Sequence, residues 1–353
     1  MNMLAAILHG RKDVRIEQVP VPAPGPGEIL VRVTAATTCG TDVKVWKRGY
    51  HATMIRPPAT FGHEFAGVVH TLGAGIQDWE PGDRVVAANS APCGSCFYCL
   101  RRSHAQCEDL QYTNGAYAEF ALLPSRLVAT NLMRVPADLS FEHAALVEPL
   151  ACVVHGMRDC GLASGDEVAI IGDGPIGLFF TRLCVLGGGH VTMIGTNPTR
   201  LEIAARLGAR GVVCGRAETD ATRSHASSGV HGGRGFDVVV ECVGQPATWS
   251  AALRYARRRG TVNLFGGCPR GTSVEVDTAR IHYDELTIRG SYHHDPDAVR
   301  EALNLLHSRL VPGDAFVQAT APLSQLPVVL ADLSNGASAV KVAILPGSRE
   351  HPG

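Results

Sequence analysis

The sequence lacks an excess of charge of either sign. It carries 32 Lys and Arg against 33 Asp and Glu, which leaves a formal net charge of −1. Proteins that bind nucleic acid or anionic membranes usually present a basic surface. The composition therefore gives no electrostatic support for a nucleic-acid partner or for attachment to a membrane surface.

Long apolar runs are also missing. The first segment, MNMLAAILHG, contains a short apolar run with no basic residue before it, so no signal peptide is predicted. The most apolar stretch, 168–189, is interrupted by Asp173, Pro175 and Arg182, and this pattern does not suit a membrane span. Repeats and low-complexity linkers are absent as well.

The pattern along the chain predicts two kinds of domain. The first 150 residues contain short strands separated by Gly, Pro and Asp, as in 19–33, 65–73 and 82–87. From about Glu148 onward, continuous apolar strands alternate with amphipathic helices, which is typical of a parallel sheet covered on both faces. We expect an α/β protein of 353 residues with a β-rich domain at 1–150 and a doubly wound parallel-sheet domain at 151–292.

Cysteines are scattered except in one cluster, where Cys93, Cys96, Cys99 and Cys107 lie close together in the sequence. Four thiolates on one short loop match a closed tetrahedral zinc site, although iron–sulfur clusters also use grouped cysteines. The chain has 11 cysteines, an odd number that does not suggest a disulfide framework. Reduced thiols and bound metal predict a cytoplasmic location.

A glycine motif predicts a dinucleotide site. Gly172, Gly174 and Gly177 form G-x-G-x-x-G between an apolar strand and a helix. In this context the first glycine permits a tight turn, the second admits a pyrophosphate, and the third allows close packing of helix and strand. The free N–H groups of the helix then face the anion.

The next strand lacks the acidic residue that an NAD site usually carries at its end. The strand ends at Gly195 and is followed by Thr196 and Asn197, with Arg200 nearby. A small residue with an arginine close by suits the 2′-phosphate of NADP, and Arg216 is a further basic residue in reach. The alternative is that Arg200 only caps a surface helix.

Three separate motifs contain residues suited to a catalytic metal. "TCGTD" supplies Cys39, "FGHEFAG" supplies His63 and Glu64, and "LVEPLAC" supplies Glu148. Singly, each has an ordinary structural explanation. Together they offer the sulfur, nitrogen and oxygen donors of a zinc site with one open position.

In order and spacing, "CGTD", "GHEFAG", the cysteine cluster, "EP" and "GDGPIG" resemble the zinc-containing medium-chain alcohol dehydrogenases, nearest to their sorbitol and threonine dehydrogenase branch. The likeness runs from about Val19 to the carboxyl terminus. It implies a GroES-like catalytic domain, with a structural zinc lobe at about 89–110, and a Rossmann cofactor domain. Residues 293–353 would return to complete the catalytic domain.

The resemblance also implies roles for individual residues. Cys39 and His63 would bind the catalytic zinc, and Glu64 and Glu148 would share the remaining positions. Asp42 would orient His63. The four clustered cysteines would hold a second, structural zinc.

The implied reaction is oxidation of an alcohol. Zinc lowers the pKa of the bound alcohol, the proton leaves through Thr41 and the cofactor ribose, and a hydride passes to the nicotinamide. Lys44 stands where related enzymes commonly have a histidine as the outlet of this relay. The residues assigned to the cofactor are Gly172, Gly174, Pro175, Ile176, Gly177, Gly195, Thr196, Asn197, Arg200, Cys242, Val243, Gly244, Phe265, Gly266 and His293.

The sequence thus predicts a zinc-dependent dehydrogenase of polar secondary alcohols that prefers NADP and forms a homodimer or homotetramer. Three alternatives stay open. The first is an NAD-dependent polyol or threonine dehydrogenase, which Gly195 disfavours. The others are a zinc-free reductase, which would not need the donor set, and a cofactor-binding protein without turnover. An acid–base role for the adjacent His293 and His294 is less expected than an incidental one.

Overall fold

The computed structural model describes residues 1–51 and 54–347. The chain divides into two compact units, one formed by Met1–Ala151 with His294–Gly353 and the other by Cys152–His293. These bounds differ by one residue from the predicted 150/151 and 292/293 boundaries. The last six residues of the predicted return segment, 348–353, lie outside the described residues.

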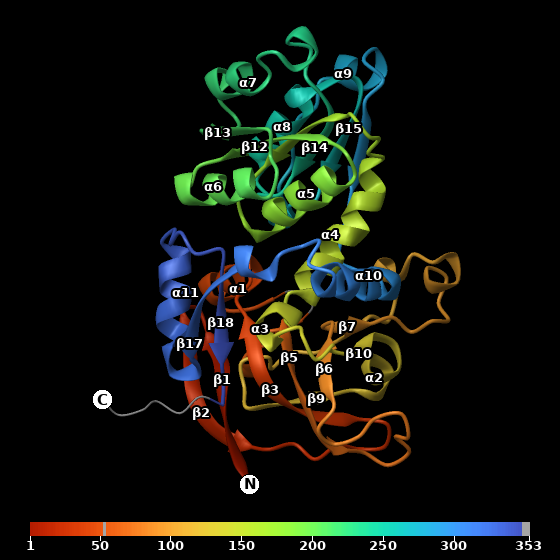
Figure 1. Cartoon of the computed structure of the whole chain (residues 1–353), viewed down its shortest axis with the longest axis vertical. Coiled ribbons are helices and arrows are strands. Elements are labelled where there is room, and N and C mark those ends of the chain that lie inside the picture. Colours follow the sequence, from red (N-terminus) through yellow and green to blue (C-terminus); the bar gives the residue numbers. More distant parts are fainter. Residues whose placement is uncertain (52–53, 348–353) are drawn as a thin grey trace. The chain divides into compact units, whose positions relative to one another are not determined.

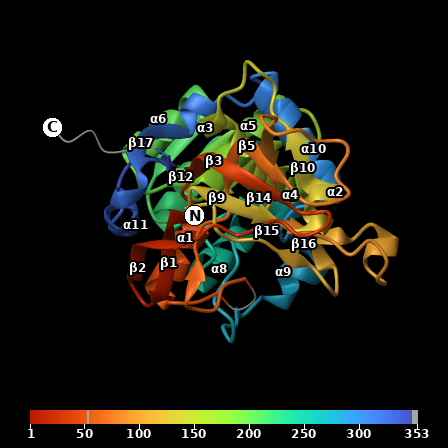
Figure 2. The ribbon, with the colours of Figure 1, turned by 90° about the horizontal axis from the view of Figure 1, so that it is seen from below.

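The first unit is built on antiparallel strands (Figure 1). A seven-stranded sheet has the order β10-β6-β5-β3-β18-β17, with β9 also paired to β3. A three-stranded sheet has the order β2-β1-β4, and Figure 2 shows β1 and β2 side by side. The strands are β1 (Asn2–Gly10), β2 (Asp13–Pro20), β3 (Ile29–Thr37), β4 (Ala59–Thr60), β5 (Phe65–Leu72), β6 (Arg84–Ala87), β7 (Ser90–Ala91), β8 (Gln111–Tyr112), β9 (Phe120–Leu123), β10 (Leu132–Arg134), β17 (Val317–Pro322) and β18 (Lys341–Leu345).

The core of the first unit is formed by the inward-facing residues of these strands, including Leu8, Val31, Phe65 and Ile344. Strands of alternating burial with one apolar face pack in this way because burial of that face is favourable. The helices of this part of the chain are α1 (Gly40–Arg48), α2 (Ser125–Asn131), α3 (Phe141–Ala144), α10 (Pro296–His307) and α11 (Leu326–Ser334), and α4 (Val147–Cys160) continues into the second unit.

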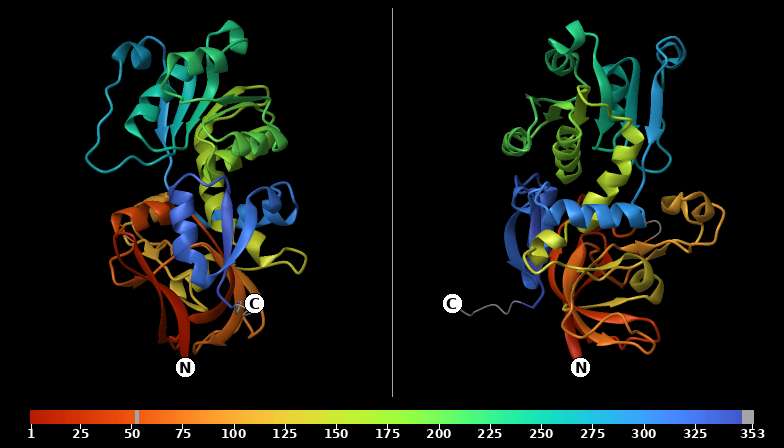
Figure 3. Two further views of the ribbon diagram at one scale, coloured as in Figure 1. Left: turned by 90° about the vertical axis from the view of Figure 1, so that its left-hand side faces the viewer. Right: turned by 45° about the vertical axis from the view of Figure 1, so that its right-hand side comes forward.

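The second unit is a parallel six-stranded sheet with the order β13-β12-β11-β14-β15-β16. Figures 1 and 3 show helices on both of its faces, as right-handed crossovers require. The fold class predicted from the sequence is therefore confirmed. The elements are β11 (Glu167–Ile171), β12 (His190–Gly195), β13 (Gly211–Cys214), β14 (Phe236–Glu241), β15 (Ala256–Leu264), β16 (Thr287–Gly290), α5 (Pro175–Leu186), α6 (Pro198–Arg206), α7 (Asp220–Ala226), α8 (Pro246–Tyr255) and α9 (Thr278–His282).

The strand order reverses between β11 and β14, and ligands of such sheets bind at the carboxyl ends of the strands on either side of that point. Among residues 1–51 and 54–347, no helix combines the length and the apolarity that crossing a membrane requires.

Candidate active site

Strand pairing gathers the predicted zinc residues at one end of the large antiparallel sheet. β3 pairs with β5 through Ala36 and Phe65. Cys39 follows β3 and His63 precedes β5, so the two residues lie at the same end of neighbouring strands. β18 pairs with the same end of β3 through Thr37 and Ala343. Segments that are far apart in the sequence therefore meet within the first unit.

Cys39 is the N-cap of α1 and forms a reciprocal capping box with Asp42. The sulfur accepts a hydrogen bond from the backbone N–H of Thr41 at 3.4 Å, and the Asp42 carboxylate accepts one from the N–H of Cys39 at 3.1 Å. The local sequence C-G-T-D thus starts the helix and holds the sulfur at its N-terminal end.

The side chain of His63 is oriented by a buried carboxylate. Its Nδ1 atom lies 3.1 Å from Oδ1 of Asp42, and Oδ2 of Asp42 accepts a hydrogen bond from the hydroxyl of Tyr117 at 2.6 Å. Burial lowers the pKa of His63, but the neighbouring Asp42 and Cys39 outweigh this effect and hold that pKa well above its ordinary value. With Nδ1 turned toward Asp42, Nε2 is left for a metal.

Glu64 forms a fully buried ion pair that the sequence analysis did not identify. The Nζ atom of Lys341 lies 2.8 Å from Oε1 and 2.5 Å from Oε2 of Glu64, and it also donates to the carbonyl of Thr38 at 2.7 Å. The hydroxyl of Thr37 donates to the same carboxylate. Burial lowers the pKa of Lys341, but the charge of Glu64 outweighs burial and raises that pKa above its ordinary value.

Glu148 is a second buried carboxylate of the first unit. Burial raises its pKa to about 7, while the positive charges of His63 and Lys341 act in the opposite direction. His294 places its Nε2 atom 4.0 Å from Oε1 of Glu148 and 3.2 Å from Oδ1 of Asn89. The two glutamates predicted near the metal are therefore in different settings, one paired with a lysine and the other beside a histidine.

The donor chemistry of this region suits zinc. One sulfur, one imidazole nitrogen and one carboxylate oxygen, from Cys39, His63 and Glu64, all lie within 4.8 Å of one another. Soft, borderline and hard donors in this combination are typical of zinc sites with an open position. Thr41 is half-buried in the first turn of α1, and Lys44 is exposed on the same helix.

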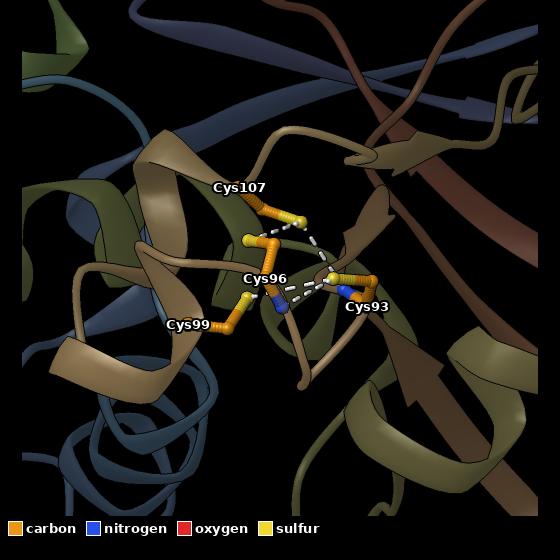
Figure 4. A group of neighbouring side chains, drawn as sticks. All are labelled: Cys93, Cys96, Cys99 and Cys107. Atoms are coloured by element: carbon orange, nitrogen blue, oxygen red, sulfur yellow. Dashed lines mark hydrogen bonds between the residues drawn. The ribbon is translucent and has the colours of Figure 1, made fainter.

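The four clustered cysteines face one another on a loop of the first unit (Figure 4). Their sulfur atoms all lie within 4.8 Å, with Cys93 to Cys99 and Cys96 to Cys107 each at 3.9 Å. Hydrogen bonds from backbone N–H groups lower the pKa of Cys93 to about 6, whereas burial raises the pKa of Cys99 to about 12. All eleven cysteines are free thiols, so the cluster is not a disulfide clasp.

The glycine turn of the second unit has the geometry expected for a pyrophosphate. Gly172 has a φ of +112°, and a Cβ on Gly177 would lie 1.8 Å from the carbonyl oxygen of Gly172. A Cβ on Gly174 would meet nothing within 4 Å, in front of the first turn of α5. The space before these N–H groups is open to a ligand, and Pro175 needs no partner for a missing N–H.

The loop after β12 carries the residues predicted to select the cofactor. Gly195 is buried at the strand end, and Asn197 caps α6 by accepting the N–H of Arg200 at 3.2 Å. The predicted helper Arg216 has its Nε 2.8 Å from Oε1 of Glu218. The cap of α6 is therefore Asn197, and Arg200 lies in the first turn of the helix with a half-buried side chain.

Two further predicted cofactor segments are held together by Glu241, which sequence reasoning missed. Its carboxylate accepts the N–H groups of Val243 and Gly244, each at 2.9 Å, and its carbonyl accepts those of Phe265 and Gly266. Cys242 lies at the start of this segment, between β14 and α8. His293, after β16, has a φ of 64° and stacks on Tyr292.

Sequence reasoning missed Lys341 and Thr37 because strand pairing brings them to Glu64. It also missed Glu241, whose carboxylate binds N–H groups two and three residues along the chain. For Lys341 the sequence offers one local signal, because a lysine is unusual at the start of the apolar strand KVAIL.

Two family models match the chain. The alcohol dehydrogenase GroES-like domain matches residues 25–137, and the zinc-binding dehydrogenase model matches residues 175–308. A sorbitol dehydrogenase of Bacillus subtilis (strain 168) is 30% identical over 298 residues, which is 82% of each chain. An L-threonine 3-dehydrogenase of Xanthomonas euvesicatoria pv. vesicatoria (strain 85-10) is 33% identical over 291 residues, covering 80% of this chain and 82% of that protein.

Solved structures of two related proteins have the same fold as this chain. A protein of Sinorhizobium meliloti 1021, described as a zinc-binding dehydrogenase bound to NADP, has a TM-score of 0.89 and 32% identity, covering 98% of this chain and 100% of the other. An alcohol dehydrogenase of Thermus sp. ATN1 has a TM-score of 0.86 and 30% identity, covering 97% and 99% of the two chains.

Proposed function

Since the chain belongs to the zinc-containing medium-chain dehydrogenase family and is an oxidoreductase of that family, we propose that it transfers a hydride between a polar secondary alcohol and NADP. The observation that carries the proposal is the group of Cys39, His63 and Glu64, whose ligand atoms lie within 4.8 Å. A protein that only binds a cofactor has no need of this donor set, nor has a zinc-free reductase.

Cys39 and His63 would hold the catalytic zinc together with a carboxylate. Glu64 lies near enough, but Lys341 and Thr37 already engage its oxygens. Glu148 is also buried, and the charge of His63 lowers its pKa against the effect of burial. The third protein ligand would be Glu64 or Glu148, the two carboxylates that the sequence assigns to this site.

When bound, zinc would supply a Lewis acid that lowers the pKa of an alcohol, and NADP would supply the hydride acceptor. The residues of the chain would supply orientation and proton transfer. Asp42 would fix the ring of His63 so that one nitrogen faces the metal. The hydroxyl of Thr41 would receive the proton of the alcohol, and the exposed Lys44 would release it to water.

The preference for NADP is supported by the end of β12, where no carboxylate follows the strand and Arg200 lies close by. A 2′-phosphate is well matched by a guanidinium, because paired N–H groups bind its oxygens. The solved relative that contains NADP points the same way. The second candidate is an NAD-dependent polyol or threonine dehydrogenase. Relatives named sorbitol dehydrogenase and L-threonine 3-dehydrogenase favour its substrate class, while their names do not specify the cofactor.

The remaining parts of the proposal concern the number of zinc ions, the substrate, the cellular location and the oligomeric state. The four clustered cysteines would bind a structural zinc, so that each chain holds two zinc ions. The substrate would be a polyol, a sugar alcohol or a hydroxy amino acid, as the names of the relatives suggest. We further propose a cytoplasmic homodimer or homotetramer.

The proposed cofactor is tested by titrating the purified protein with NADPH and, separately, with NADH, while nicotinamide fluorescence is followed. We expect NADPH to bind at least about tenfold more tightly, the effect of roughly one charge-assisted hydrogen bond. Tighter binding of NADH would refute the NADP proposal but leave the dehydrogenase intact. If neither nucleotide binds, the proposal that the protein is a dehydrogenase is refuted.

A further inference from the structure

Asp173 connects the glycine turn to the loop after β12. It stands between Gly172 and Gly174, at a position that the glycine spacing leaves open. Its Oδ2 atom accepts the backbone N–H groups of both Thr196 and Asn197, each at 2.7 Å. Two hydrogen bonds from neutral donors to one carboxylate are strong, so this side chain fixes the start of the loop.

The same carboxylate fills the space beside Gly195. A Cβ on Gly195 would lie 2.4 Å from Oδ2, 2.5 Å from Cβ and 2.6 Å from Cγ of Asp173. Gly195 does not have a positive φ, so backbone conformation does not demand a glycine here. The residue is instead required to be small because Asp173 occupies the place where its side chain would begin.

Arg200 is the third member of this arrangement. Burial lowers its pKa, and the negative charge of Asp173 opposes that shift. Asp173 therefore binds the first two residues of the loop through their N–H groups, and its charge acts on Arg200. A carboxylate is present at the end of β12 after all, but it comes from the glycine turn, and the loop amides already bind it.

We propose that Asp173 and Gly195 form a matched pair that determines cofactor specificity, with Asp173 as a positioning residue. The consequence for specificity rests on the proposed NADP function. Because the Asp173 side chain blocks residue 195, replacing Gly195 with an acidic residue cannot by itself build the ribose-binding carboxylate of an NAD site. The exchange needs both positions.

The proposal is tested with Gly195→Asp, Asp173→Ala and the double variant, each titrated with NADPH and NADH. Gly195→Asp alone should weaken both nucleotides at least about tenfold, because the two side chains overlap and displace the loop. The double variant should bind NADH at least about tenfold more tightly than Gly195→Asp does. Equal NADH binding by the single and double variants would overturn the pairing.

The matched control is Asp166→Ala combined with Gly195→Asp. Asp166 precedes β11 and its carboxylate also accepts a backbone N–H, that of Ala163 at 2.8 Å, at the opposite end of the strand. This change should leave the defect of Gly195→Asp in place. Rescue by Asp166→Ala would mean that the recovery is not specific to Asp173, and the pairing would be rejected.

Amide hydrogen exchange provides a readout that does not depend on cofactor. In Asp173→Ala the N–H groups of Thr196 and Asn197 should exchange at least about tenfold faster, since they lose their acceptor. In Asp166→Ala they should not change. Unchanged exchange in Asp173→Ala would overturn the positioning role, whereas a preference of the unaltered protein for NADH would overturn only the NADP proposal.

Discussion

At the scale of single residues, the charge of Glu64 is balanced by Lys341, which lies 277 positions later in the chain. Both side chains are almost completely buried. A buried ion pair is costly to break from one side, because the remaining charge has no partner and no water. The pair therefore links the last strand of the first unit to the loop that carries His63.

We expect Lys341→Met to destabilise the protein by about 3–5 kcal/mol, as loss of one partner of a buried pair does. The measurement is denaturant unfolding of the metal-loaded protein. Adding Glu64→Gln to Lys341→Met should recover part of the lost stability.

The control is Lys47→Met, because Lys47 is exposed and its Nζ also donates to a backbone carbonyl, that of Ser334. This change should lower the free energy of unfolding by less than about 0.5 kcal/mol. Equal costs for the two lysines would contradict this account.

In the proposed zinc site Asp42 would orient His63, so replacement of Asp42 should weaken zinc binding. Asp42→Asn keeps the shape of the side chain but removes its charge, and we expect zinc affinity to fall about 10–100-fold. Competition with a chelator measures this. Tyr117→Phe removes only a hydrogen bond to Asp42 and should have a smaller effect. If the two variants lose zinc equally, the carboxylate does not orient the histidine.

At the scale of elements, the cysteine loop should depend on its metal. It contains only two short 3-10 turns, Cys99–Arg101 and His104–Gln106, and therefore has little structure of its own. Cys99→Ser should remove the structural zinc and expose the loop to proteolysis, while the catalytic zinc stays. Cys214→Ser, an exposed thiol on β13, is the control. Retention of both zinc ions by Cys99→Ser would show that the cluster is not a zinc site.

The sequence predicted features whose residues are close together in the chain better than contacts between distant residues. The glycine turn was predictable, since Gly172, Gly174 and Gly177 and their flanking strand and helix are adjacent in the chain. The donors Cys39 and His63 were recognised from short motifs. The partners Lys341 and Asp173 were not, because strand register and packing bring them to Glu64 and Gly195.

Asp237 at the start of β14 makes the second unit sensitive to acid. Burial raises its pKa, but hydrogen bonds from His231 and the N–H of Glu167 and the contact with Arg257 outweigh burial, and the pKa lies below its ordinary value. A carboxyl with a lowered pKa in the folded state contributes stability above its unfolded pKa and loses it as pH falls.

We therefore expect the unaltered protein to lose stability between neutral pH and about pH 3 more steeply than Asp237→Asn does. Thermal unfolding across this pH range tests the difference between the two slopes. Asp78→Asn provides a comparison for the general effect of removing one carboxylate. Identical slopes for the unaltered protein and Asp237→Asn would exclude this group as a source of acid sensitivity.

At the scale of the whole molecule, the predicted metal ligands belong to the first unit and the predicted cofactor residues to the second. The last segment of the first unit follows the parallel-sheet unit in the sequence, and it brings Lys341 to Glu64 and His294 to Glu148. The second unit contains the glycine turn and the loop after β12. Under the proposed function, the first unit would supply the metal site and the second unit the nucleotide site.

The most direct test is turnover by the metal-free protein and by the same protein reconstituted with zinc. A panel of polyols, sugar alcohols and hydroxy amino acids is supplied with NADP, and formation of NADPH is followed. The account predicts that NADPH forms with at least one of these alcohols only after zinc is restored, and that Cys39→Ser abolishes this activity. Equal turnover with and without zinc, or undiminished turnover by Cys39→Ser, would contradict the central claim.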